Sequence, residues 1–306
     1  MEKNNFASIE SIISVAKKGG MFILVDDEKR ENEGDLVIST SDSNAKNINF
    51  MAKFGRGLIC LALDSLQAKR LNLSLMSPVN QSRNKTAFTI SIEAKKGITT
   101  GISAKDRAKT IKIASKKNVN KNEIVSPGHV FPIIAKDGGV LVRAGHTEAS
   151  VDISKLAKKN NSAVICEIMN EDGTMAKGQD LFNFAKKHKL KIGKIEDLIA
   201  YRLKKEKLIK LKKQSKIDVK NQKYNNCVLV FIRDTNLKSV TQTLRDYKSK
   251  GFYKKGNDKL IKNYGIGAQI IKSLNIKNMI LVTRSKKKVV GLDGYGIKIK
   301  KQEILK

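Results

Sequence analysis

The chain has 306 residues, of which 40% are hydrophobic and 29% are charged, and its formal net charge is +32 at pH 7. A chain of this length and hydrophobicity can form two domains with separate cores, which excludes an intrinsically disordered protein. No run approaches the roughly 18 to 20 apolar residues that span a bilayer, so we expect no membrane partner.

The positive charge comes from 61 Lys and Arg against 29 Asp and Glu. Nucleic-acid-binding proteins show such a balance. Here, however, Lys is spread along the whole chain, and aromatic residues, at 5% with no Trp, offer few rings for stacking on bases. We therefore expect a solvated basic surface and no specific nucleic acid, with nucleic-acid binding as the alternative. Because Lys is the usual cation, Arg30 and Arg143 stand out in motif loops, where a planar guanidinium can hold a carboxylate or phosphate.

Three widely separated cysteines, Cys60, Cys166 and Cys227, form neither a disulfide framework nor a zinc-ligand pattern. The N-terminus, MEKNNFASIESI, has no apolar core of the kind found in signal peptides. Both features predict a cytoplasmic protein.

Short apolar runs and helical periodicities follow one another over the first part of the chain. Predicted helices cover residues 8–18, 44–54, 104–114, 147–159 and 178–188, and predicted strands cover residues 21–25, 35–39, 57–63, 85–93 and 163–169. Ser103 with Asp106 matches a capping box, and HVFPIIA and GVLVR flank residues 136–139 in a hairpin pattern. KIGKIEDLIAYRLKKE predicts a strand edge followed by a helix. Because strands and helices intermix without strict βαβ alternation, we predict an α+β domain with a central mixed sheet flanked by helices.

A Lys-rich, weakly patterned stretch at residues 204–223 predicts a linker between a first domain, residues 1–203, and a small α/β C-terminal domain, residues 224–306. In the second domain we predict strands at CVLVFIR and NMILVTR and helices at residues 237–248 and 266–274.

The loop DDEKRENEGD, residues 26–35, concentrates six acids between two apolar strands of a basic chain. His129 in SPGHVFP and His146 in RAGHTEAS lie in loops rich in Gly and Pro, whereas His188 lies among lysines and is expected to be a surface residue. Carboxylates with an imidazole suit magnesium or manganese, and the absence of paired Cys argues against zinc. From residue types alone, a solvated acidic loop remains the alternative.

Five motifs, in this order and spacing, resemble those of the 3,4-dihydroxy-2-butanone 4-phosphate synthase family over about residues 5 to 203. They are VDDEKRENEGDLVI, FTISIEAKKGITTGISAKDRAKTI, SPGHVFPIIAKDGGVLVRAGHTEASVDISKLA, VICEIMNEDGTMAK and IEDLIAYR. The resemblance implies a magnesium-dependent lyase of riboflavin biosynthesis that converts D-ribulose 5-phosphate to L-3,4-dihydroxy-2-butanone 4-phosphate and formate. It also implies a homodimer with active sites at the subunit interface.

Carried over by motif, Glu31 and His146 would be the ligands of Mg²⁺ or Mn²⁺, and His129 and Glu167 the essential acid–base pair. The substrate-binding residues would be Arg30, Glu31, Asp35, Arg143, Ala144, Gly145, His146, Thr147 and Glu167. The chemistry agrees, because enolising a ketose requires a base near the acidic carbon and a cation that stabilises the enediolate oxygens. An Arg and a Gly-containing loop such as RAGHT suit the phosphate.

The second domain resembles the end of GTP cyclohydrolase II, as CVLVFIRD and NYGIGAQIIKSLNIKNMILVTRSKKKVVGLDGYGI show. That family carries a zinc site built from three cysteines, and Cys227 is the one cysteine after residue 166. Leu260 and Lys262 occupy the places of its Asp and Arg in a D-x-R spacing. We therefore predict a shortened, inactive domain without zinc; the alternative is a bifunctional enzyme that also has GTP cyclohydrolase II activity.

Overall fold

The computed structural model describes residues 6–28, 30–206, 264–283 and 296–304. The chain divides into two compact units, Met1–Arg202 (the first unit) and Leu203–Lys306 (the second unit). Several predictions for the second unit fall outside the described residues: the strand at 227–233, the helix at 237–248, most of the linker, and the positions of Cys227, Leu260 and Lys262.

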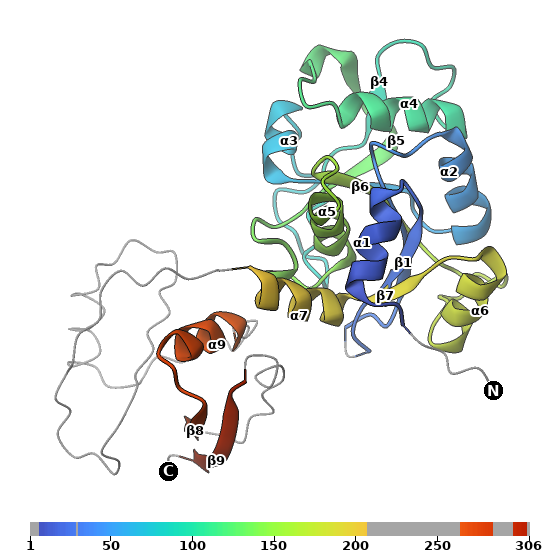
Figure 1. Cartoon of the computed structure of the whole chain (residues 1–306). Helices are drawn as coiled ribbons and strands as arrows, with labels where there is room; N and C mark the ends of the chain where they lie inside the picture. The colour runs from blue at the N-terminus through green and yellow to red at the C-terminus, as the bar shows by residue number, and fades with distance from the viewer. Residues whose placement is uncertain (1–5, 29, 207–263, 284–295, 305–306) are drawn as a thin grey trace. The chain divides into compact units, whose positions relative to one another are not determined.

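A seven-stranded mixed sheet forms the centre of the first unit, in the order β4-β5-β3-β6-β2-β1-β7 (Figure 1). The strands are β1 (Phe22–Val25), β2 (Gly34–Ser39), β3 (Cys60–Leu63), β4 (Ile92–Ala94), β5 (Ile124–Ile134), β6 (Ser162–Glu167) and β7 (Ile192–Lys194). β5 runs parallel to β3 and β7 runs parallel to β1, whereas the other neighbours are antiparallel. The predicted α+β class with a mixed sheet is confirmed.

Helices cover both faces of this sheet, which is why β1, β2, β3 and β6 are apolar and almost wholly buried. The helices are α1 (Ile9–Lys17), α2 (Ala45–Phe50), α3 (Ser65–Arg70), α4 (Ala104–Ala114), α5 (His146–Leu156), α6 (Gln179–His188) and α7 (Ile195–Lys205), and a π-helix, η1 (Met51–Gly55), extends α2. Ile12 of α1 and Ile153 of α5 pack on one face, where the two helices lie side by side (Figure 1). Ile48 of α2, Ile111 of α4 and Leu181 of α6 pack on the other.

The predicted hairpin around residues 136–139 is wrong. HVFPII belongs to β5, which pairs with β4 and lies parallel to β3, so its partners are distant in sequence. Gly138 and Gly139 both have positive φ, and the chain continues into a short 3-10 helix, η3 (Gly139–Leu141), ahead of α5. A Cβ on Gly139 would lie 2.2 Å from the Asp152 carboxylate, so a close approach between the turn and α5 selects this glycine.

Two further predictions require correction. Of the strand expected at residues 85–93, the last two residues belong to a strand, β4, whereas Phe88 and Thr89 make isolated bridges and the rest is irregular. The capping box at the start of α4 is incomplete: Ser103 Oγ accepts from Asp106 N at 3.1 Å, but the Asp106 carboxylate accepts from Thr99 and Gly101 instead of returning to Ser103.

In the described part of the second unit, helix α9 (Tyr264–Ser273) precedes two parallel strands, β8 (Asn278–Thr283) and β9 (Lys298–Ile304). The helix and the first strand confirm the predictions at residues 266–274 and 278–284. Buried Ile297 packs with Ile271, Met279 and Ile299. β9, KIKKQEI, was not predicted, since its lysines conceal the apolar alternation. None of the helices in the described part of the chain is long and apolar enough to cross a membrane.

Candidate active site

The acidic loop connects two adjacent antiparallel strands, β1 and β2, and therefore projects from one end of the sheet. Asp26 holds the loop closed, because its Oδ1 accepts a hydrogen bond from Glu33 N at 3.0 Å. Arg30 Nη1 donates to Asp26 Oδ2 at 2.6 Å and also to Glu31 Oε2. One guanidinium thus already bridges two carboxylates, which shows that this position attracts positive charge.

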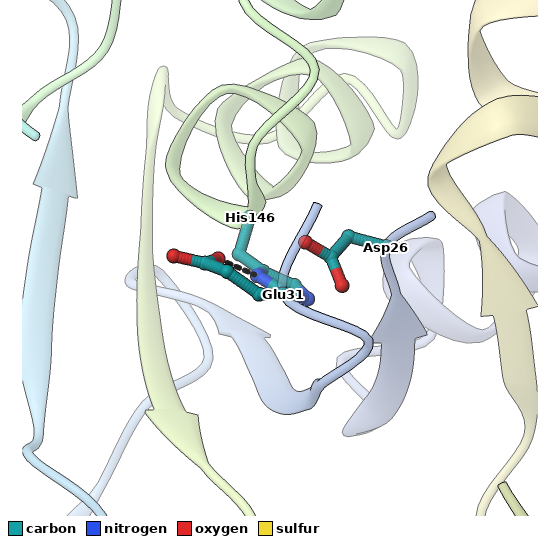
Figure 2. A group of neighbouring side chains, drawn as sticks. All are labelled: Asp26, Glu31 and His146. Carbon is teal, nitrogen blue, oxygen red and sulfur yellow. Dashed lines mark ion pairs between the residues drawn. The ribbon is translucent and has the colours of Figure 1, made fainter. Parts of the chain in front are cut away.

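His146, the first residue of α5, faces this loop from the other side (Figure 2). Its Nδ1 lies 3.9 Å from Glu31 Oε2 and 3.7 Å from Asp35 Oδ1. Asp26, Glu31 and His146 each offer one ligand atom, and these atoms all lie within 4.8 Å of one another. Three buried side-chain polar atoms of the described residues have no hydrogen-bond partner, and two of them, His146 Nε2 and Asp35 Oδ1, belong to this cluster. Two carboxylates with an imidazole form a donor set that fits magnesium or manganese.

Burial lowers the pKa of His146, and the surrounding acids oppose that shift only in part. A lowered pKa keeps the imidazole neutral, as a metal ligand must be. The protonation state of this histidine is therefore compatible with a cation site.

Asp35 and Glu167 are direct cross-strand neighbours in the β2–β6 pair. Burial raises the pKa of Asp35 well above its ordinary value, and repulsion from Glu167 and Glu31 adds to the shift. Burial likewise raises the pKa of Glu167. The pKa values of both carboxyl groups, one beside His146 and the other its cross-strand neighbour, are thereby shifted toward holding a proton, as general acid–base catalysis near neutral pH requires.

The turn after η1 fixes the orientation of Glu167, a feature that sequence reasoning missed. Leu58 N donates to Glu167 Oε2 at 2.8 Å, and a Cβ on Gly57 would lie 2.6 Å from the same oxygen. Arg56, with φ at 69°, shapes the turn and donates from Nη1 to Met169 O at 3.0 Å. The signal available in the sequence was the run Gly-Arg-Gly ahead of an apolar strand.

Arg143 and Gly145 shape the approach to α5. Arg143 donates to Glu148 Oε2 at 2.6 Å and to Thr86 Oγ1 at 2.8 Å, so its guanidinium is fixed within the fold. Gly145 is the N-cap residue and supplies no capping side chain, and a Cβ there would lie 2.3 Å from Arg143 Nη1. The first turn of α5, with Thr147 buried in it, thus starts beside a fixed cation.

His129 lies at the same end of the sheet but on another strand, β5. Phe131 of β5 is in register with Cys60 of β3, which is in register with Ile165 of β6. His129 and Glu167 each lie two residues beyond this row, toward the same end. The His129 side chain is 43% exposed, and its Nδ1 lies 2.9 Å from Glu93 Oε1.

His188 is part of an aromatic cluster and is not a freely solvated side chain. The centroids of its ring and those of Phe50, Phe54 and Phe184 are 5.1, 4.7 and 4.5 Å apart. Burial, with Lys187 and Arg56 nearby, lowers its pKa. The cluster joins α6 to α2 and η1, so His188 has a packing role away from the acidic loop.

The structure brings together four of the residues carried over by motif, Arg30, Glu31, Asp35 and His146. It adds Asp26, which the sequence marked only as one of several acids in the loop. Its burial, with a relative exposure of 6%, separates it from the exposed Asp27 and Glu28. Spacing in the sequence does not reveal that difference.

Two family profiles match the chain. The profile for 3,4-dihydroxy-2-butanone 4-phosphate synthase matches residues 10–201, and the profile for GTP cyclohydrolase II matches residues 212–303. The riboflavin biosynthesis protein RibBA of Aquifex aeolicus is 38% identical, over 97% of this chain and 92% of its own length. The 3,4-dihydroxy-2-butanone 4-phosphate synthase of Sulfurospirillum multivorans is 40% identical, over 95% and 92%.

Solved structures agree with these sequence matches. RibBX of A. baumannii, described as a two-domain 3,4-dihydroxy-2-butanone 4-phosphate synthase, is similar over 97% of this chain and 99% of its own, with 35% identity and a TM-score of 0.77. A 3,4-dihydroxy-2-butanone 4-phosphate synthase in complex with two magnesium ions is similar over 65% of this chain and 98% of its own, with 36% identity and a TM-score of 0.63.

Proposed function

We propose that the sheet end described above is the active site of this chain, which belongs to the 3,4-dihydroxy-2-butanone 4-phosphate synthase family. The enzymes of this family are lyases of riboflavin biosynthesis that convert D-ribulose 5-phosphate to L-3,4-dihydroxy-2-butanone 4-phosphate and formate. One observation supports this proposal most directly. Asp26, Glu31 and His146 place their ligand atoms within 4.8 Å of one another, beside two carboxyl groups of raised pKa.

Magnesium, or manganese in its place, would be held by Glu31 and His146, with Asp26 as a third donor. When bound there, such a cation stabilises the negative charge that develops on the sugar oxygens during enolisation. The complex of a similar enzyme with two magnesium ions supports this choice. The donor set holds no thiolate, and we expect no zinc.

Glu167 and His129 would form the acid–base pair. Glu167 has one carboxylate oxygen held by Leu58 N, and its raised pKa favours a bound proton near neutral pH. His129 offers an exposed ring at the same end of the sheet. Together they would supply and remove protons at the carbon and oxygen atoms of the sugar, while Asp35 contacts the substrate beside them.

The phosphate of the substrate would bind at the start of α5, to the segment of Arg143, Ala144, Gly145, His146 and Thr147. Backbone N–H groups at a helix N-terminus favour an anion, and Gly145 leaves them without a capping side chain. Arg143, held in place by its ion pair with Glu148, would present its guanidinium to the phosphate. Arg30 would contact the sugar from the acidic loop.

We further propose a cytoplasmic homodimer with active sites at the subunit interface. His129 is exposed in the single chain, and enolisation chemistry benefits from a site closed to water. Exposed apolar side chains surround the strands that carry the site, among them Leu58, Val125 and Val142. A second subunit would cover such side chains and exclude water.

For the second unit we propose no GTP cyclohydrolase II activity. The proposed boundaries are a synthase domain at residues 1–203, a linker at residues 204–223 and an inactive domain at residues 224–306. The profile match over residues 212–303 favours the alternative of a bifunctional enzyme. However, the alignment with the Aquifex aeolicus protein extends over 373 positions, more than the 306 residues of this chain. Segments of that relative therefore have no counterpart here, which agrees with the missing cysteines.

The proposal is tested by measuring formate release from ribulose 5-phosphate. Activity should disappear in EDTA and return with added magnesium or manganese. A chain that released no formate with either metal, or released it equally well in EDTA, would contradict the proposed function. A salt-dependent gel shift with nucleic acid, measured in parallel, tests the alternative suggested by the basic composition.

A further inference from the structure

Glu93, a carboxylate outside the acidic loop, contacts the exposed histidine of the site. We propose that Glu93 is a positioning residue that sets the tautomer and orientation of His129. This inference rests on the proposed acid–base role of His129. If Glu93 Oε1 accepts a hydrogen bond from Nδ1–H, then Nε2 is the ring nitrogen left to exchange protons with the substrate.

The burial of the two partners shows which one is fixed. The Glu93 side chain is 14% exposed and the His129 side chain 43% exposed, with 2.9 Å between Oε1 and Nδ1. Among the described residues, Glu93 is the acid within ion-pair distance of this ring. The carboxylate is therefore the anchored partner, and the imidazole extends from it toward solvent at the reacting end of the sheet.

A glycine with a restricted conformation makes room for Glu93. Gly101 has φ at 91°, and a Cβ built on it would lie 1.4 Å from Glu93 Oε1. No other residue fits there without displacing the carboxylate. The loop ahead of α4 is thus shaped around the Glu93 side chain.

Asp106 fixes that loop in place. Its Oδ2 accepts hydrogen bonds from Thr99 Oγ1 at 2.6 Å, Thr99 N at 3.2 Å and Gly101 N at 3.1 Å. These bonds explain why Asp106 does not complete the capping box. The carboxylate at the start of α4 holds the loop that surrounds Glu93.

The strand that carries His129 is shaped to meet this loop. Val130 of β5 pairs with Ile92, whereas Val125 pairs with Glu93, so residues 126–129 bulge from β5 opposite Glu93. Gly128 sits in this bulge, where a Cβ would lie 2.2 Å from Ile92 O. An incidental surface ion pair, worth little in stability, does not require two close-packed glycines and a fixed loop.

The expected consequence is geometric. A carboxylate oxygen can only accept a hydrogen bond, so Glu93 selects the tautomer of His129 that carries its proton on Nδ1. Replacing Glu93 by Gln places an amide there, which can accept from Nδ1–H or donate to an unprotonated Nδ1, so the tautomer is no longer fixed. Glu93→Asp keeps the carboxylate but shortens the side chain, so it tests whether the carboxylate must extend as far as the ring.

The test measures the tautomer of His129 directly, from the chemical shifts of the two ring nitrogens in NMR spectra of the full-length protein. The chain contains three histidines, so the His129→Asn spectrum assigns the signals. In Glu93→Gln we expect the shifts of Nδ1 and Nε2 to move toward each other, because both tautomers are then populated. We also expect kcat to fall about 10- to 100-fold with KM changed less, a loss typical of residues that orient a reacting group. Glu93→Asp should recover part of the loss.

Glu123→Gln is the matched control, since Glu123 lies just before β5 and pairs with exposed Lys116. The ring-nitrogen shifts of His129 and kcat should not change in this variant. Gly101→Ala is a second variant that displaces the Glu93 carboxylate, and it should reproduce the effect of Glu93→Gln on the His129 ring nitrogens.

Unchanged ring-nitrogen shifts of His129 in Glu93→Gln, in a protein whose thermal midpoint shows it folded, overturn the inference. Changed shifts together with full formate release by His129→Asn overturn the catalytic role of His129 and with it the positioning role of Glu93. In that case the contact between the two side chains is confirmed but serves no step of the reaction.

Discussion

Two histidines lie at the same end of one sheet, and their surroundings differ. His146 is 7% exposed and lies within 3.9 Å of Glu31 and Asp35, with Asp26 beside them. His129 is half-exposed and contacts one acid, Glu93. A buried imidazole among several carboxylates favours a bound cation, whereas an exposed imidazole with a single carboxylate favours proton exchange.

The two regions differ because different segments of the chain meet in each. The His146 cluster joins a hairpin loop to the first residue of a helix, and its excess negative charge is balanced in part by Arg30. The His129 pair joins a bulge in β5 to Glu93, the middle residue of β4. The first region is organised by charge, and the second by close backbone approach at Gly101 and Gly128.

The largest effect is expected at the cation site. Glu31→Gln and His146→Ala each remove a proposed ligand, and we expect formate release to fall at least about a thousandfold, or about 4 kcal/mol of transition-state stabilisation. Glu28→Gln, an exposed neighbour in the same loop, is the matched control and should retain activity. Normal formate release by either ligand variant would remove the assignment.

Asp26→Asn tests whether the third donor belongs to the cation site. Asp26 Oδ1 accepts from Glu33 N, and an amide oxygen in Asn can accept the same bond, whereas the bond from Arg30 to Oδ2 is lost. We expect the concentration of magnesium needed for half-maximal activity to rise about 10-fold or more, with a smaller change in maximal rate. An unchanged magnesium dependence would restrict the ligands to Glu31 and His146.

A second loss of catalytic rate is expected at the carboxyl group of Glu167, between the two regions. Glu167→Gln removes a proton carrier and should lower kcat about 10²- to 10⁴-fold. Gly57→Ala should lower kcat in the same direction but less, because the added Cβ displaces the carboxylate without removing it. Glu171→Gln, an exposed acid nearby, serves as control. Should Gly57→Ala match the wild type in kcat, the orientation of Glu167 by this turn would be unimportant.

The sequence predicted the parts of this site that depend on local pattern. Apolar runs on both sides of the acidic loop indicated two strands, so the projecting loop and its position followed. Non-local pairing was not predictable in the same way: HVFPII was assigned to a hairpin, although its partners in β3 and β4 are far away in sequence. Burial likewise separates Asp26 from Asp27, and no spacing rule encodes it.

The contact between Glu93 and His129 shows the same limit. Both residues lie in motifs that the sequence marked, yet 36 residues separate them, and a bulge and a glycine with positive φ bring them together. The resemblance to the family supplied the acid–base candidates, whereas tertiary structure identified the partner of His129.

Asp35 provides a stability test of the crowded region. Burial raises its pKa in the folded state above the ordinary value of 3.8, so the folded protein binds this proton more tightly than the unfolded chain. Its contribution to stability is fully present below about pH 3.8 and is lost as the pH rises through the folded-state pKa. Without added metal, Asp35→Asn should therefore have a higher thermal midpoint than the wild type at pH 7, by a few degrees.

The gain in Asp35→Asn should vanish toward low pH, where both side chains are neutral, and activity should be lost because Asp35 contacts the substrate in the proposed site. Thermal unfolding in EDTA across the pH range measures the effect. A thermal midpoint at pH 7 below that of the wild type would contradict the buried, destabilising carboxylate.

The smallest effect on the lyase is expected from the second unit. Truncation after Glu206, beyond the end of α7, should leave formate release from ribulose 5-phosphate within about twofold of the full chain, since the first unit has its own core and is compact by itself. A solved relative has a corresponding length: the synthase in complex with two magnesium ions matches 65% of this chain, and the match covers 98% of that relative.

Neither the full chain nor the truncated protein should release formate from GTP, even with added zinc. A tetrahedral zinc site needs at least three protein ligands, and the sequence after residue 203 contains one cysteine and no histidine. Weak binding of GTP to the Lys-rich surface is compatible with this prediction, because phosphates attract lysines without any catalytic machinery. Turnover of GTP by the full chain, lost on truncation after Glu206, would show that the second unit is an active cyclohydrolase and that the alternative of a bifunctional enzyme is correct.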